Sequence, residues 1–96
     1  MVHVFISGFV QGIGFRQFIK HNARKLSLKG WVRNIPASRQ GGPDGRVEAV
    51  FSGNHQNLEK MVDLCKKGPF LAEVENIEVE WNSKVKLDTI GFEVIK

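Results

Sequence analysis

The sequence contains a single cysteine among its 96 residues, no apolar run near the ~20 residues that span a membrane, and no basic segment at its N-terminus. Because Cys65 has no second cysteine to pair with, an internal disulfide is excluded and a reducing compartment, the cytoplasm, is expected. Residues 1–5 run directly into a strand-like segment, so we expect neither a secretory signal nor a membrane anchor.

The spacing of metal ligands is also missing from the sequence. His3, His21 and His55 are not spaced as ligands with one another or with Cys65. Cys65 falls on the apolar face of a predicted helix, which favours a buried core residue over a nucleophile. We therefore expect no metal site.

What remains is the composition of an ordinary globular protein. The 42% hydrophobic and 25% charged residues predict one domain over residues 1–96. The net charge of +4, which we interpret as modest and dispersed, favours small anions and also nucleic acid without deciding between them.

Hydrophobic periodicity predicts the order of the secondary-structure elements. Alternation predicts strands at residues 2–7, 31–34, 46–51 and 77–81 and a short terminal strand at 92–95. Helical spacing predicts one helix from residue 15 to about Leu26 and another that ends at Gly68-Pro69. The apolar face of the first comprises Phe15, Phe18, Ile19, Ala23 and Leu26, and that of the second Leu58, Met61, Val62 and Cys65. Either Ser52 or Asn54 is suited to cap the second helix.

This β-α-β-β-α-β order predicts an α+β, ferredoxin-like sandwich. Right-handed crossovers place both helices on one face of an antiparallel sheet, with the short C-terminal strand added. The first two strands then run parallel with the third between them, so their carboxyl ends share one edge. We therefore expect Asn34 to lie beside the turn that follows Ser7.

That turn is the most informative stretch of the chain, with three glycines in residues 8–14. Glycines let the backbone turn sharply, and amides that converge at a helix N-terminus form an anion site. Arg16 adds a charged fork suited to phosphate. Glycine-rich turns also occur where nothing binds, and the spacing matches neither the Walker nor the dinucleotide pattern.

The residues of two motifs resemble those of the acylphosphatase family. The first is Gly8-Phe9-Val10-Gln11-Gly12-Ile13-Gly14-Phe15-Arg16, in which only Ile13 replaces the family's usual valine. The second is Gly30-Trp31-Val32-Arg33-Asn34, continued by Asp44-Gly45-Arg46-Val47-Glu48. Gly68-Pro69 and the terminal Gly91-Phe92-x-Val94 also fit, so the resemblance covers essentially the whole chain.

The resemblance implies hydrolysis of the carboxyl–phosphate bond of a small acyl phosphate, without metal or organic cofactor. By the same resemblance Arg16 binds the phosphoryl group and Asn34 orients the attacking water. The phosphate-binding loop is expected to comprise the backbone amides of Val10, Gln11, Gly12, Ile13, Gly14 and Phe15. A departing carboxylate needs no proton, so positioning and charge stabilisation suffice for this reaction. Carbamoyl phosphate, 1,3-bisphosphoglycerate and acetyl phosphate all stay open as substrates.

One segment departs from the family pattern. Seven extra residues, 37–43, separate Ile35-Pro36 from Asp44. A longer solvated turn is the favoured interpretation, because Gly, Ser and Pro tolerate added length at little cost. A lid, or an extra cation through Arg39, is the alternative at this edge.

Two other functions compete with the enzyme. RNA-recognition modules share the element order, but their aromatic signature is missing from residues 46–51. A non-catalytic domain that binds phosphate or carbamoyl phosphate, as in hydrogenase-maturation proteins, belongs to a much longer chain, whereas we expect these 96 residues to be complete. We expect a monomer with no nucleic-acid or membrane partner.

Overall fold

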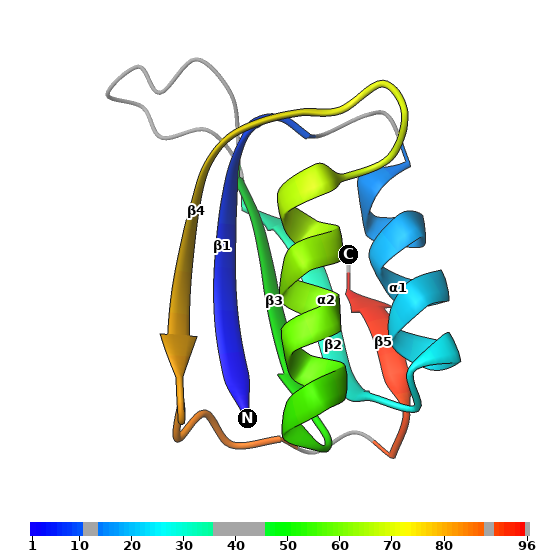
Figure 1. Cartoon of the computed structure of the whole chain (residues 1–96), viewed down its shortest axis with the longest axis vertical. Helices are drawn as coiled ribbons and strands as arrows, with labels where there is room; N and C mark the ends of the chain where they lie inside the picture. The colour runs from blue at the N-terminus through cyan, green and yellow to red at the C-terminus, as the bar shows by residue number, and fades with distance from the viewer. Residues whose placement is uncertain (11–13, 36–45, 88–89, 96) are drawn as a thin grey trace.

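The computed structural model describes residues 1–10, 14–35, 46–87 and 90–95 (Figure 1). The elements follow the order β1 (Val2–Phe9), α1 (Phe15–Lys25), β2 (Lys29–Ile35), β3 (Arg46–Ser52), α2 (His55–Lys67), β4 (Glu73–Trp81) and β5 (Phe92–Ile95). This order confirms the predicted ferredoxin-like sandwich. No helix among these residues is both long enough and apolar enough to cross a membrane.

The strands form one five-stranded sheet in the order β4-β1-β3-β2-β5, and both helices cover the same face (Figure 1). β1 and β2 both pair antiparallel with β3, which lies between them. β1 and β2 therefore run parallel to each other, and their carboxyl ends, Phe9 and Ile35, lie at one edge. α1 begins at that same edge (Figure 1).

β5, to which the sequence analysis assigned no direction, pairs parallel to β2 and makes the sheet mixed. Its short sequence carries no information on direction. The chain leaves β4 at one side of the sheet and enters β5 at the other, near the end where β2 also begins (Figure 1). β5 therefore runs in the direction of β2.

β4 begins four residues earlier than predicted. The predicted connector included residues 73–76, but this segment pairs antiparallel with the end of β1, where Gly8 lies opposite Val74 and Phe9 opposite Glu73. The exposed Glu73 and Glu75 obscured the strand in the sequence. Charged residues are ordinary on an edge strand, where they discourage pairing with other chains.

The core lies between the helices and the covered face of the sheet. Its helical contributions match the predicted apolar faces: Phe15, Ile19 and Ala23 are buried in α1, and Leu58, Met61, Val62 and Cys65 in α2. Phe18 and Leu26 pack against this cluster at its margin. The Asn54 side chain accepts a hydrogen bond from the Asn57 amide at 2.9 Å, so Asn54 is the cap of α2.

Candidate active site

The turn between β1 and α1 depends on two glycines with positive φ. Gly8, at φ 127°, follows a bulge in β1, and a Cβ there would lie 2.2 Å from the Glu73 carbonyl oxygen. Gly14 begins α1 in the left-handed conformation, with φ 80° and ψ 18°. A Cβ at Gly14 would meet no atom of the described residues within 4 Å, so among these residues only the conformation of Gly14 requires glycine.

The N-terminus of α1 is left open by its own sequence. Gly14 provides no side-chain cap, and the first turn of α1 contains no acidic residue. The first amides of a helix have no intrahelical acceptor and carry a partial positive charge. The start of α1 therefore offers hydrogen-bond donors to an anion.

A small pocket of about 90 Å³ lies at this helix start. It is lined by Val10, Gly14, Phe15, Arg16, Gln17 and Asn34. The side chains of Val10 and Phe15 are buried and supply its apolar lining. Because pockets for whole ligands measure ~300–1,000 Å³, a pocket of this size accepts only a small group such as a phosphoryl group.

Asn34 contributes an unsatisfied polar atom to this pocket. Its Oδ1 is buried and has no hydrogen-bond partner, the one such side-chain atom found in the described part of the chain. An unpaired buried acceptor costs roughly 1–3 kcal/mol, so native proteins rarely retain one without a reason. A water molecule or a ligand in the pocket would supply the missing donor.

Arg16 lies in the first turn of α1 and is half-buried. No ion pair in the described ranges involves its guanidinium. An arginine stays charged throughout the physiological pH range and presents several donors in a fixed fork. Arg16 therefore supplies a positive charge at the pocket that no acidic residue of the described ranges pairs with.

The structure brings five of the predicted site residues together from two elements and the turn between β1 and α1. Val10, Gly14, Phe15, Arg16 and Asn34 share the pocket. Gln11, Gly12 and Ile13 lie outside the described residues, as do the extra residues 37–43. Gln17 was missed by the sequence analysis, although its place directly after Arg16 in the first turn of α1 would have indicated it.

The other chemically active side chains lie elsewhere. None of the three histidines lines the pocket. Cys65 is buried in α2, as predicted, and burial raises the pKa of its thiol to about 12. Such a thiol is neutral at physiological pH and is therefore no nucleophile. Over the described ranges, no cluster of His, Cys, Asp or Glu is arranged to hold a metal ion.

A buried carboxylate next to the site was also missed. Glu48 of β3 is 6% exposed and lies on the face of the sheet opposite the helices. It accepts from Arg33 Nε at 2.7 Å, and its other oxygen lies 2.6 Å from His3 Nε2. Arg33 is exposed on this face of the sheet, and Glu48 is its cross-strand partner in the register. These two contacts of Glu48 tie β1, β3 and β2 together at Arg33, the residue before Asn34.

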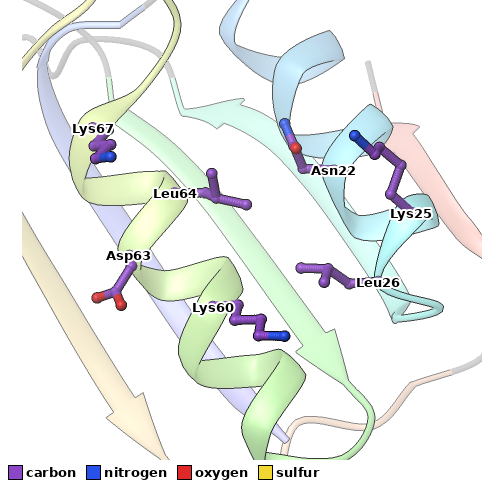
Figure 2. Close-up of a pocket in the computed structure, with 7 residues that line it drawn as sticks. All are labelled: Asn22, Lys25, Leu26, Lys60, Asp63, Leu64 and Lys67. Carbon is purple, nitrogen blue, oxygen red and sulfur yellow. The ribbon is translucent and has the colours of Figure 1, made fainter.

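A larger cavity of about 390 Å³ lies between α1 and α2 (Figure 2). Leu64 of α2 and Leu26, which directly follows α1, project into it from opposite sides, with Lys60 beside them, whereas Asp63 points away (Figure 2). The cavity contains neither Arg16 nor Asn34. The candidate site is therefore identified by the residues that line the smaller pocket, Arg16 and Asn34 among them, and not by pocket volume.

Comparison with known proteins gives one consistent result. The family model described as Acylphosphatase matches residues 2–94. The chain is 48% identical over 79 residues to an acylphosphatase of Chloroflexus aurantiacus, covering 82% of this chain and 78% of that one. It is 45% identical over 93 residues to an acylphosphatase of a Roseiflexus species, covering 97% and 91%.

Solved structures agree with these sequence relatives. An acylphosphatase from Coxiella burnetii superposes with a TM-score of 0.80 at 32% identity, covering 98% of this chain and 90% of that chain. Full-length HypF in its phosphate- and nucleotide-bound form superposes with a TM-score of 0.78 at 28% identity. That match covers 99% of this chain but only 11% of HypF.

Proposed function

The chain belongs to the acylphosphatase family and is an acylphosphatase that acts on small acyl phosphates, and from this premise we propose how its residues divide the reaction. Arg16 and the backbone amides from Val10 to Phe15 bind the phosphoryl group. Asn34 holds the attacking water. The products are a carboxylate and inorganic phosphate.

The observation that carries this proposal is the pairing of Arg16 and Asn34 in one small pocket. Arg16 supplies a positive charge that no acidic residue of the described ranges pairs with, and Asn34 supplies a buried oxygen that accepts no hydrogen bond from these residues. A water molecule that donates to Asn34 Oδ1 would satisfy that oxygen and be fixed beside the phosphoryl group. This arrangement supports binding by Arg16 and orientation of water by Asn34.

The chemistry requires no further group. The water oxygen attacks phosphorus as the bond to the acyl oxygen breaks, and the carboxylate leaves with that electron pair. The proton of the water passes to a phosphoryl oxygen of the substrate. Holding water and phosphorus in line lowers the barrier by positioning, and each preorganised donor contributes roughly 10²–10³ in rate. We therefore propose that no metal or organic cofactor takes part.

We also propose the domain organisation, the oligomeric state and the localisation of the protein. Residues 1–96 act as one acylphosphatase-like domain, as a monomer and without a nucleic-acid partner. We place it in the cytoplasm, which the single unpaired cysteine supports.

The similarity to HypF favours one alternative, a domain that binds phosphate or carbamoyl phosphate without turnover. A benzoyl phosphate assay in the presence of EDTA separates the two. The enzyme proposal predicts steady turnover by the wild type and a loss of at least about 10²-fold in Arg16→Ala. Wild-type protein that binds phosphate but does not turn over benzoyl phosphate would establish the alternative.

A further inference from the structure

The net charge is not dispersed along the chain, contrary to our interpretation of the composition. The ten acidic residues all lie at Asp44 or later, whereas the first 43 residues contain seven lysines and arginines. α1 therefore carries cationic side chains with no acidic residue among them. Such one-sided charge attracts anions to this helix.

Three cationic side chains of α1 line a depression that adjoins the active-site pocket. The depression measures about 480 Å³ and is lined by Gln17, Lys20, His21, Arg24 and Lys25. Gln17 also lines the active-site pocket, so the two hollows share a wall. An extended ligand that passes Gln17 would reach from one into the other.

Lys20 is the cation of this depression nearest to Arg16. Four residues of helix advance about 6 Å along the axis and turn about 40° around it. Helical side chains lean toward the N-terminus of their helix, so Lys20 leans toward Arg16 and the pocket. Among the described residues Lys20 has no ion pair.

Arg24 lies one turn further on and is partly engaged. Its Nη2 donates to the Phe92 carbonyl oxygen at 3.3 Å, which draws the guanidinium toward β5. Lys20 is therefore the group that an anion leaving the pocket would meet first, with Arg24 behind it.

The pocket itself indicates where the acyl part of the substrate lies. The Asn34 oxygen is buried, whereas Gln17 is exposed, so the pocket opens on the α1 side. If Asn34 holds the attacking water, the leaving acyl oxygen lies opposite that water, because attacking and leaving oxygens are roughly in line. The acyl group then extends out past Gln17.

We propose that Lys20 binds a second oxyanion on the acyl part of the substrate, so that this enzyme prefers acyl phosphates that carry a further carboxylate or phosphate. This inference rests on the proposed roles of Arg16 and Asn34. It narrows the substrate class from acyl phosphates in general to those with two anionic ends.

The test compares kcat/KM for three substrates that differ at one ring position: benzoyl, 4-carboxybenzoyl and 4-phosphonobenzoyl phosphate. Each ratio to benzoyl phosphate is corrected for the intrinsic hydrolysis rate. The wild type is expected to favour one or both of the substrates with a second anionic group by roughly two- to fivefold at low salt, the range of an exposed ion pair. The preference should fall at high salt. A larger preference for 4-carboxybenzoyl phosphate would indicate a carboxylate subsite, and a larger preference for 4-phosphonobenzoyl phosphate a phosphate subsite.

In Lys20→Gln, the kcat/KM ratio of each substrate with a second anionic group to benzoyl phosphate is expected to come close to one. In Lys20→Glu this ratio is expected to fall below one. Because the readout is a ratio, a smaller folded fraction in either variant cancels. Lys60→Gln is the matched control, since it removes the same charge from the α1–α2 cavity, which does not include Gln17 (Figure 2). It should leave the ratio unchanged.

Three results would overturn the subsite. The first is a wild-type kcat/KM ratio of one or below, and the second is a ratio in Lys20→Gln equal to that of the wild type. The third is a fall of the ratio in Lys60→Gln as large as that in Lys20→Gln, which would assign the preference to the net positive charge of the whole protein. Failure of the proposed function is a different result, because the wild type would then not turn over benzoyl phosphate at all.

Discussion

At the scale of single residues, Arg16 is proposed to act through its shape as well as its charge. Arg16→Lys keeps a positive charge but loses the planar fork that makes two parallel hydrogen bonds to a phosphoryl group. We expect kcat/KM for benzoyl phosphate to fall by about 10²-fold and inhibition by phosphate to weaken. Lys60→Arg, the reverse exchange on α2, should change neither. Near wild-type turnover in Arg16→Lys would show that a point charge suffices.

The residues of the pocket differ in how far the sequence alone predicts them. The motif and the strand order together placed Asn34 beside the turn after β1, because two parallel strands end at the same edge. The lack of a hydrogen-bond donor to the buried Asn34 Oδ1 among the described residues was not predictable, since it depends on every neighbour of that atom. Gln17, by contrast, could have been predicted as a pocket residue from its place directly after Arg16, but not as a residue that lines both the pocket and the depression.

At the scale of elements, Glu48 joins the three strands next to the site. Glu48→Gln keeps the shape of the side chain but removes the charge that faces Arg33 and His3. We expect a loss of about 1–3 kcal/mol in the free energy of unfolding, because a buried, charge-assisted pairing is weakened. Urea unfolding would measure it.

Glu78→Gln is the matched control for this exchange. Glu78 lies on β4, which β1 separates from the strand of Glu48, is exposed, and lies opposite Phe5 in the register. Exposed substitutions usually change stability by less than about 0.5 kcal/mol. Equal losses in the two variants would show that the contacts of Glu48 with Arg33 and His3 contribute nothing of their own.

The elements themselves were predictable where the signal is local. Both helices, their apolar faces and a cap among two candidates followed from spacing over a few residues. The predicted start of β4 was wrong, because pairing with β1 makes residues 73–76 a strand in spite of their polar composition. The direction of β5 was not predictable from its four residues, because it depends on the sheet edge that the chain reaches.

At the scale of the whole molecule, the distribution of titratable groups predicts the pH dependence. His3 contacts Glu48, His55 lies 2.7 Å from Glu59, and His21 lies in the depression of α1. None of them lines the active-site pocket. We expect kcat to stay nearly flat from about pH 5 to 8, apart from the ionisation of the substrate, whereas a histidine base would impose a step near ~6.5. A step that disappears in His21→Gln would contradict the base-free mechanism.

The division of labour between Arg16 and Asn34 is tested most directly by kcat and phosphate inhibition measured together in Asn34→Ala. The variant removes the proposed water ligand and leaves the phosphoryl donors in place. We predict that kcat for benzoyl phosphate falls by at least about 10²-fold while the inhibition constant of phosphate stays within about twofold. A variant with a native circular dichroism spectrum that loses phosphate inhibition as severely as turnover would show that Asn34 binds the phosphoryl group instead.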